Sequence, residues 1–258
     1  SCSDTLVLSI FVNPTQFGPG EDLAAYPRDL TRDQECAARE GVDLLFAPAK
    51  DALYEPDHDT WVTVPGLAQG LCGRSRPIHF RGVATIVSKL FLLARPDLAV
   101  FGQKDWQQLA IIRRLNRDMG FDVRIEGHPI VREPDGLAMS SRNVNLSPEQ
   151  RVQAAHIYQG LCLASRQVRE GEASVPLIKS AVREYFARHM DQGEEDYLEV
   201  VHPDSLEPLH QINEAEEQGL MAVAMRFSSL TPASGNAKTT VRLIDNMLLG
   251  GPTACSPS

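Results

Sequence analysis

The stretch Leu6–Val12, with the sequence LVLSIFV, is the clearest fold signal in the chain. A continuous apolar run of this length, rich in Leu, Ile and Val, is typical of a strand that is buried on both faces of a parallel sheet. Such a strand has neighbours on each side, fed by crossover helices. We therefore expect an α/β fold, and a chain that opens directly on this strand leads us to expect that preceding elements are missing.

The segments after this strand alternate between strand and helix patterns. A turn region of Asn13–Asp22 is followed by an expected helix at Leu30–Arg39 and an expected strand at Val42–Phe46, which together complete a βαβ unit. The same alternation then predicts these elements: a helix at Gly82–Ala94, a strand at Leu98–Phe101, a helix that ends near Met119, and a strand at Asp122–Glu126. This order predicts a doubly wound parallel sheet with helices on both faces.

Beyond Ile130 the order of elements changes. Helical patterns at Pro148–Arg169 and Val175–Met190 come first, and strand patterns follow. The expected strands are Tyr197–His202, Leu220–Phe227 and Val241–Leu249. We therefore expect a first domain at 1–130 and a smaller C-terminal α+β domain at 131–258, and we expect the small, polar tail from Gly250 to Ser258 to be disordered.

Composition excludes several classes of protein. Of the 258 residues, 43% are hydrophobic and 23% are charged, which is ordinary for a globular protein, and the formal net charge of −9 disfavours binding to nucleic acid. No apolar run reaches the length of a membrane span, and no signal-type start is present, so we expect a cytoplasmic protein without a membrane partner. The five cysteines are isolated from one another, which predicts reduced thiols and neither a zinc site nor a disulfide framework.

The first candidate for chemistry is the turn of Gly102, Gln103, Lys104 and Asp105, between a strand and a helix. Backbone N–H groups at such a helix start bind phosphate, and Lys104 adds a mobile positive charge. In the plainer alternative, Gly102 makes a turn, Asp105 caps the helix and Lys104 is a solvated surface residue. Both alternatives stay open on position alone.

The loop Asn13–Gly18 carries neutral amides in place of charges. A carboxylate that must attack phosphorus stays more nucleophilic beside a glutamine than in a bidentate arginine clamp. Gln16 suits that task, and so does Gln108, which lies four residues after Lys104 on the same face of the expected helix. The alternative is a turn whose amides satisfy backbone groups.

Two further segments are candidates. The loop Met139–Arg142 places two hydroxyls and a guanidinium between the expected domains, where they could grip a triphosphate and neutralise charge that builds up on it; capping and solvation are the alternative. The stretch Arg74–Arg81 is the densest positive patch of this acidic chain, so that it either attracts an anionic substrate or forms a solvated loop.

Several long segments, in the same order, resemble the pantothenate synthetase family of pantoate–β-alanine ligases. They are SIFVNPTQFGPGEDLAAYPRDL from Ser9, RPIHFRGVATIVSKLF from Arg76, FGQKDWQQLAIIRRL from Phe101, REPDGLAMSSRNVNLS from Arg132, and VRLIDNMLL near the end. The resemblance implies a Rossmann-like sheet of the nucleotidylyl transferase type. It also implies that pantoate attacks the α phosphorus of ATP, that pyrophosphate leaves, and that the amine of β-alanine then displaces AMP from pantoyl adenylate.

The same resemblance assigns roles to matching positions. Gln16 and Gln108 match the pair that holds pantoate. The positions that match ATP contacts are Gly102, Gln103, Lys104, Asp105, Val131, Met139, Ser140, Ser141 and Arg142. Among them Lys104, Ser140 and Arg142 are the expected catalytic residues, with Mg²⁺ as a further source of positive charge and no expected protein ligands for it. The family is usually dimeric, which implies a homodimer.

One departure from the family accompanies the match. Members of the family carry a first strand and an HxGH loop ahead of the segment that matches Leu6–Val12, and the printed chain contains neither. We therefore expect an uncovered apolar edge beside that segment and an incomplete set of catalytic groups. Two alternatives stay open: a non-catalytic homologue that binds ATP or pantoate without forming the adenylate, and a related ligase for another hydroxy acid.

Overall fold

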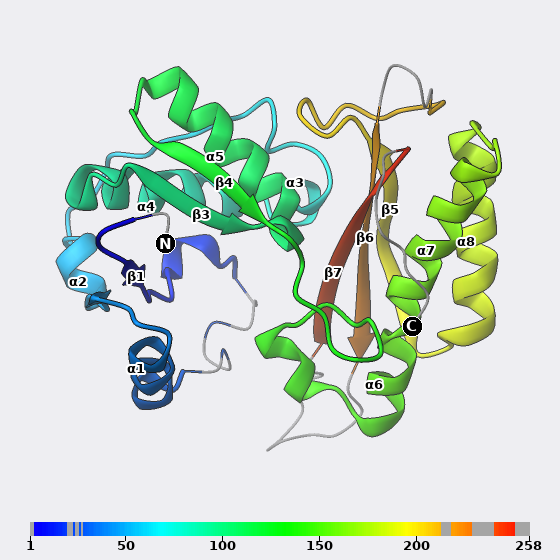
Figure 1. Ribbon diagram of the computed structural model, residues 1–258, viewed down its shortest axis with the longest axis horizontal. Coiled ribbons are helices and arrows are strands. Elements are labelled where there is room, and N and C mark those ends of the chain that lie inside the picture. The colour runs from blue at the N-terminus through cyan, green and yellow to red at the C-terminus, as the bar shows by residue number, and fades with distance from the viewer. Residues whose placement is uncertain are drawn as a thin grey trace. The chain divides into compact units, whose positions relative to one another are not determined.

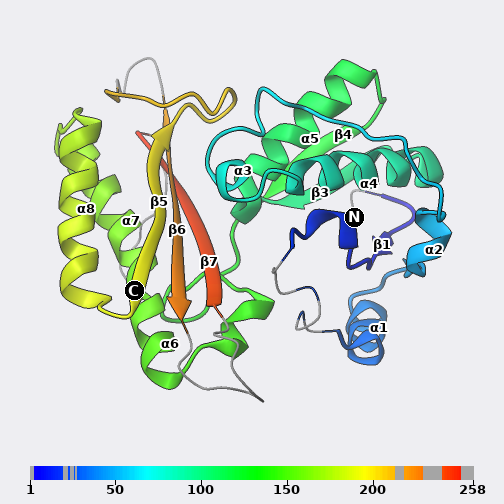
Figure 2. The same ribbon diagram turned by 180° about the vertical axis from the view of Figure 1, so that it is seen from behind.

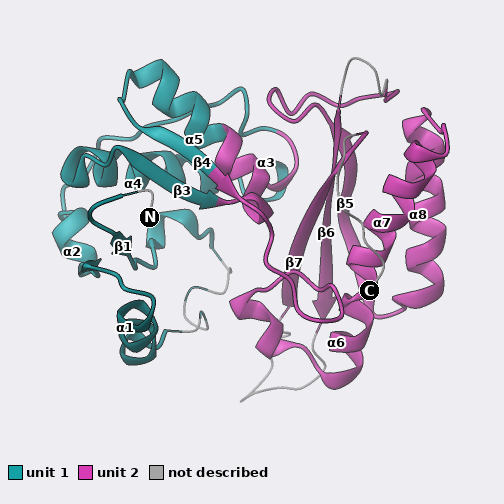
Figure 3. Ribbon diagram, in the orientation of Figure 1, with its two compact units in different colours: residues 1–69, 73–101, 111–126 teal, residues 70–72, 102–110, 127–258 magenta. Residues whose placement is uncertain are grey.

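A computed structural model describes residues 3–19, 23, 26, 28–212, 218–228 and 240–250. The chain divides into two compact units, coloured separately in Figure 3. Unit 1 comprises residues 1–69, 73–101 and 111–126, and unit 2 comprises residues 70–72, 102–110 and 127–258. Unit 2 therefore includes the Gly102–Asp105 turn as well as the C-terminal half of the chain. The boundary that we expected near residue 130 stays a prediction.

Unit 1 contains the strands of the α/β half of the chain. Strand β1 (Val7–Ser9) pairs in parallel with β2 (Leu44–Phe46), so that Val7 lies opposite Leu44. Strand β3 (Leu98–Gly102) pairs with β4 (Arg124–His128) (Figure 1). The last residues of both strands belong to unit 2. Strands joined through helices confirm the expected α/β class with a C-terminal α+β part.

The first strand differs from the expectation in length and burial. Leu6–Val12 was expected to be one buried strand, but β1 covers only Val7–Ser9, and Leu6, Val7 and Leu8 are 45%, 45% and 39% exposed. The expectation of burial on both faces is therefore wrong. Within the described part of the chain β1 pairs with β2 alone, and an apolar strand is buried on two faces only where neighbouring elements cover both.

The helices of this half of the chain lie close to their expected positions. Helix α1 (Leu30–Arg39) has the expected bounds, because Asp29 caps it by accepting from the Arg32 N–H. Helix α4 (His79–Ala94) ends where Arg95 takes a left-handed conformation with φ of 47°. The remaining helices are η1 (Pro14–Gln16), α2 (Lys50–Leu53), α3 (Cys72–Ser75), η2 (Gln103–Asp105) and α5 (Trp106–Met119).

Unit 2 is built on an antiparallel sheet with the order β5-β6-β7, where β5 is Gly193–Val201, β6 is Gly219–Ser228 and β7 is Thr240–Leu249. Helices α7 (His156–Arg169) and α8 (Val175–His189) pack on it, as both views show (Figures 1 and 2). The core between them includes Leu161, Ile178 and Phe227. The two helices carry apolar residues at helical spacing and the strands carry apolar runs, so that helices and sheet bury these residues against each other.

One expected helix is divided in the structure. Pro148–Arg169 was expected to be continuous, but α6 (Pro148–Ala154) ends at Ala155 and α7 begins at His156; η3 (Ser141–Asn145) precedes them. Ser147 and Gln150 form a capping box that fixes where α6 begins. The Ala155 N–H donates to the Val152 carbonyl, and a bond of this i→i+3 kind tightens the last turn of a helix.

Two expectations about the whole chain can be compared with the structure. Cys36 and Cys72 are thiols outside any disulfide, whereas Cys162 is disulfide-bonded, so the expectation of reduced thiols is wrong at Cys162. In the described ranges no helix is long and apolar enough to cross a membrane. The expectation for the tail falls mainly on residues 251–258, which lie outside the described residues.

Candidate active site

The lysine turn is held by the last strand of unit 2. Residues Gln103–Asp105 form the short helix η2 at the end of β3. The side-chain amide of Asn246, on β7, donates to the carbonyl oxygens of Gln103 and Lys104, both at 2.9 Å. Asn246 is 5% exposed, so these bonds are shielded from water and fix the backbone of the turn.

Lys104 reaches from this turn to the loop before η3. Its Nζ donates to the Met139 carbonyl at 3.1 Å. That loop is a narrow hairpin, since the Met139 N–H donates to the Val131 carbonyl at 2.9 Å. Val131 and Met139 are 56% and 50% exposed, which leaves two apolar side chains uncovered beside the lysine. A flat apolar ligand group would find a contact surface there.

Charged groups surround Lys104 inside unit 2. Burial lowers the pKa of Lys104, and Arg142 and Arg132 lower it further, while Asp105 and Asp245 act in the opposite direction. Burial also raises the pKa of Asp245, against the effect of the Arg132 guanidinium, which grips this carboxylate at 2.6 and 3.0 Å. An anionic ligand beside Lys104 would stabilise the charged form of the ammonium, which burial and the two arginines disfavour.

The serine–arginine loop lies at the start of η3. Ser140 caps η3, because its Oγ accepts from the Arg142 N–H at 3.2 Å. The capping alternative is therefore realised at Ser140, whose hydroxyl can still donate to a further acceptor. Ser141 and Arg142 follow within η3, on the same loop as Met139. Through Met139 the structure brings this loop to Lys104, within unit 2.

The second amide candidate also belongs to unit 2. Gln108 lies in the first turn of α5, four residues beyond Lys104. Its neighbour Gln107 is used structurally: it accepts from the Cys72 N–H at 3.0 Å and donates to the Gly70 carbonyl at 2.9 Å. The two adjacent glutamines therefore differ in their surroundings: Gln107 is buried, whereas Gln108 is half-buried.

The amide loop lies in unit 1 and is more ordered than its composition indicates. Asn13 is 2% exposed; its Oδ1 accepts from Thr15 N and Thr15 Oγ1 at 3.2 and 2.9 Å, and its Nδ2 donates to the Gly82 carbonyl at 3.1 Å. Asn13 therefore satisfies backbone groups, as the plainer alternative proposed. In contrast, the Gln16 side-chain amide bonds to none of the described residues, which leaves it available to a ligand.

Several residues that organise the site were not identified from the sequence. Asp245 and Asn246 lie inside an apolar strand, and this polar pair within VRLIDNMLL was the signal that could have found them. Buried polar side chains in a strand need partners, and here the partners come from distant segments. The Arg74–Arg81 patch also has a local role, because Arg76 and His79 both donate to the Gln16 carbonyl.

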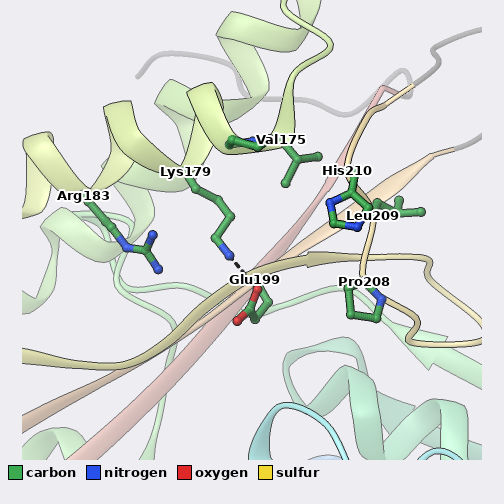
Figure 4. Close-up of a pocket in the computed structure, with 8 residues that line it drawn as sticks. Val175, Lys179, Arg183, Glu199, Pro208, Leu209 and His210 are labelled. Atoms are coloured by element: carbon green, nitrogen blue, oxygen red, sulfur yellow. Dashed lines mark hydrogen bonds and ion pairs between the residues drawn. The ribbon is translucent and has the colours of Figure 1, made fainter.

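A separate hollow of about 270 Å³ lies on unit 2 between α8 and β5 (Figure 4). Lys179 and Arg183 point toward it, but Lys179 pairs with Glu199 at 2.6 Å and Arg183 with Glu195 at 2.7 Å. Each cation is thus matched by a carboxylate. The hollow offers no excess charge for an anion, and we assign no ligand to it.

The fold and the lysine site define an α/β protein of the nucleotidylyl transferase type. The sequence profile described as Pantoate-beta-alanine ligase matches residues 1–248. A pantothenate synthetase of Solidesulfovibrio magneticus is 59% identical over 246 residues, which cover 95% of this chain and 81% of the relative. The chain therefore belongs to the pantoate–β-alanine ligase family.

Solved structures agree with this assignment. The crystal structure of pantothenate synthetase from Thermus thermophilus has a TM-score of 0.84 and 46% identity, over 95% of this chain and 83% of that one. A pantoate–β-alanine ligase from Francisella tularensis, complexed with β-γ ATP and β-alanine, has a TM-score of 0.67 and 28% identity, over 95% of this chain and 79% of that one.

Proposed function

We infer that the protein condenses pantoate with β-alanine to give pantothenate, at the expense of ATP, which becomes AMP and pyrophosphate. Family membership supports this reaction. The observation on which the site rests is the contact between Lys104 Nζ and the Met139 carbonyl. It puts a half-buried ammonium at the base of the serine–arginine loop, where a phosphate chain can be gripped from two sides.

We assign the phosphates of ATP to the lysine turn and the serine–arginine loop. Backbone N–H groups of Gly102–Asp105 and the start of α5 offer donors to an anion, and the exposed side chains of Val131 and Met139 offer an apolar surface to the base. Lys104, Ser140 and Arg142 then stabilise charge as pyrophosphate departs. One preorganised donor in such a site contributes about 3 to 4 kcal/mol to lowering the barrier.

We assign pantoate to Gln16 and Gln108, the two amides that match the pantoate-holding pair of the family. A neutral amide orients the carboxylate without neutralising it, so that the oxygen keeps its lone pair for attack at the α phosphorus. The carboxylate oxygen forms the new P–O bond and the bond to pyrophosphate breaks. The β-alanine nitrogen then forms the amide bond, and AMP leaves with the electron pair.

We assign Mg²⁺ to the phosphates of ATP rather than to a protein cage. Over the described ranges no three His, Cys, Asp or Glu side chains lie together as a metal site, and an ion that keeps most of its ligands as water and phosphate needs no such group. The ion would add positive charge beside the departing pyrophosphate.

We further propose a cytoplasmic homodimer with no nucleic-acid or membrane partner. The cytoplasm supplies ATP, and the net charge of −9 repels polyanions. Light scattering at micromolar concentration tests the dimer, for which one mass, twice that of the chain, is expected.

Oxygen transfer tests the reaction. Pantoate labelled with ¹⁸O in its carboxylate should pass one ¹⁸O to AMP, because a carboxylate oxygen bridges to phosphorus in the adenylate. The assay uses the protein as its gene encodes it, with mass spectrometry of AMP and pantothenate. Unlabelled AMP, or ADP in place of AMP, would overturn the adenylate route. Binding of ATP or pantoate with no AMP formed would favour the non-catalytic alternative.

A further inference from the structure

The Gln16 main-chain carbonyl is the acceptor for two side chains from one segment. Arg76 Nη2 donates to it at 3.2 Å, and the imidazole Nδ1 of His79 lies 3.1 Å from it. Both donors lie sixty or more residues away in sequence, at separations of 60 and 63. A carbonyl with two donors has both its lone-pair directions used, which fixes the peptide plane next to the Gln16 side chain.

The same segment meets the amide loop at a second point. Asn13 Nδ2 donates to the Gly82 carbonyl, in the first turns of α4. A Cβ at Gly82 would lie 2.6 Å from the Thr15 carbonyl oxygen and 2.9 Å from Gln16 N, so that only glycine admits this approach. The loop therefore sits directly on the backbone of α4, and the segment Arg76–Gly82 forms a platform for it.

The contact also fixes which nitrogen of His79 carries hydrogen. A carbonyl oxygen only accepts, so that Nδ1 must donate and must be protonated. The opposite neutral tautomer, with hydrogen on Nε2 alone, would set two lone pairs against each other. The geometry therefore requires hydrogen on Nδ1, in the neutral ring or in the charged one.

We infer that Arg76 and His79 are positioning residues for pantoate, which act through the backbone of Gln16. This inference rests on the proposed contact between Gln16 and pantoate. The two side chains hold the carbonyl, the carbonyl sets the direction of the Gln16 side chain, and the free amide meets the substrate carboxylate. Arg76 and His79 thereby serve a carboxylate site through a backbone carbonyl and not by pairing with the carboxylate, which keeps it nucleophilic.

Three substitutions at one position separate this role from simple packing. In His79→Asn the side-chain NH₂ can take the place of Nδ1–H, in His79→Gln it takes the place of Nε2, and in His79→Ala no donor remains. We expect His79→Ala and His79→Gln to raise KM for pantoate about tenfold. His79→Asn should restore KM to within about threefold, and KM for ATP should stay within about twofold throughout.

Arg76→Ala should reproduce the rise in KM for pantoate, whereas Arg74→Ala serves as the matched control. Arg74 is an exposed arginine of the same stretch, so that its loss changes the local charge without touching Gln16. An equal rise in the KM values for pantoate and ATP, or no difference between His79→Asn and His79→Gln, would overturn the positioning role. Thermal melting of each variant identifies any loss of folding.

Two further measurements complete the test. Gln16→Ala should raise KM for pantoate at least as much as His79→Ala does. A Gln16→Ala variant with an unchanged KM would show that Gln16 does not contact pantoate. A KM that rises in Gln16→Ala but not in His79→Ala would show that only the positioning role is wrong. In the unmodified protein, ¹⁵N chemical shifts of the His79 ring should report hydrogen on Nδ1. A neutral ring with hydrogen only on Nε2 would rule the inference out whatever the variants show.

Discussion

The side-chain amide of Asn246 donates to the carbonyl oxygen of Lys104 at 2.9 Å, across 142 positions of the chain. The last strand of the protein thus supports the backbone of the residue that we assign to the phosphates. Because the same amide also reaches the Gln103 carbonyl, one side chain controls the whole turn.

Asn246→Asp should weaken the use of ATP. The substitution keeps the shape of the side chain but sets a carboxylate against two carbonyl oxygens, and each buried acceptor that loses its donor costs roughly 1 to 3 kcal/mol. We expect KM for ATP to rise about tenfold or more. Asn116→Asp is the matched control, because the Asn116 amide also donates to a backbone carbonyl in a half-buried setting, that of Val123 at 2.9 Å, but lies in unit 1. Equal effects of both changes on KM for ATP would refute the special role of Asn246.

Lys104→Met should remove most of the rate with little loss of stability. The methionine keeps the apolar stem and removes the charge, which should lower kcat by about a hundredfold to a thousandfold. Lys179→Met provides the comparison: Lys179 is also a half-buried lysine of unit 2, but it pairs with Glu199 at 2.6 Å. Steady-state kinetics on both variants decide the matter, and a Lys104 variant with kcat near that of the parent protein would exclude the assigned role.

Unit 2 should lose stability in mild acid through His156. Burial, and then the nearby His189, lower the pKa of His156 from 6.5, and its Nδ1 lies 2.8 Å from the Tyr185 hydroxyl. A base whose folded pKa is depressed contributes stability above its unfolded pKa and loses that contribution as pH falls through the folded pKa. The free energy of unfolding, measured with urea, should therefore be lower at pH 5.5 than at pH 7.5, and this difference should be smaller in His156→Gln. His128→Gln, at an exposed histidine, should leave the decrease unchanged; a His156→Gln variant with the full decrease would contradict this account.

Gly160→Ala should destabilise the packing of α7 on α8. A Cβ at Gly160 would lie 2.2 Å from Phe186 Cε1, so that the ring must shift, and overpacking of this kind costs about 1 to 3 kcal/mol in the free energy of unfolding. Gly66→Ala meets nothing within 4 Å and should change stability by less than about 0.5 kcal/mol. Denaturant titration measures both, and a Gly160→Ala variant as stable as Gly66→Ala would show that the two helices tolerate separation.

Much of the fold could be predicted from local sequence patterns. The bounds of α1 follow from the Asp29 cap, and β6 and β7 follow from apolar runs that need no distant partner to be recognised. In contrast, β5 begins at Gly193, ahead of the expected Tyr197, in a polar stretch. The exposure of Leu6, Val7 and Leu8 could not be predicted from the apolar run itself, because such a run shows a preference for burial but does not show which neighbours cover it. Only the departure from the family pattern predicted an uncovered apolar edge there. The division at Ala155 also could not be predicted, because neither glycine nor proline stands at that point of the helical pattern.

The candidate site was only partly predictable for the same reason. The types of residue in the lysine turn and the serine–arginine loop suggested phosphate chemistry, but their meeting depends on a contact between residues 35 positions apart. The supports of the site, Asn246 and the Arg132–Asp245 pair, come from still longer separations. Periodicity carries no information on such contacts, whereas packing of β7 against η2 creates them.

Exchange of labelled pyrophosphate into ATP tests the central claim, formation of an adenylate on pantoate, most directly. The account predicts exchange that requires pantoate and proceeds without β-alanine, because pyrophosphate departs before the amine attacks. Exchange that is absent when pantoate and Mg²⁺ are supplied to the protein as its gene encodes it, or that β-alanine supports equally well by itself, would contradict the account.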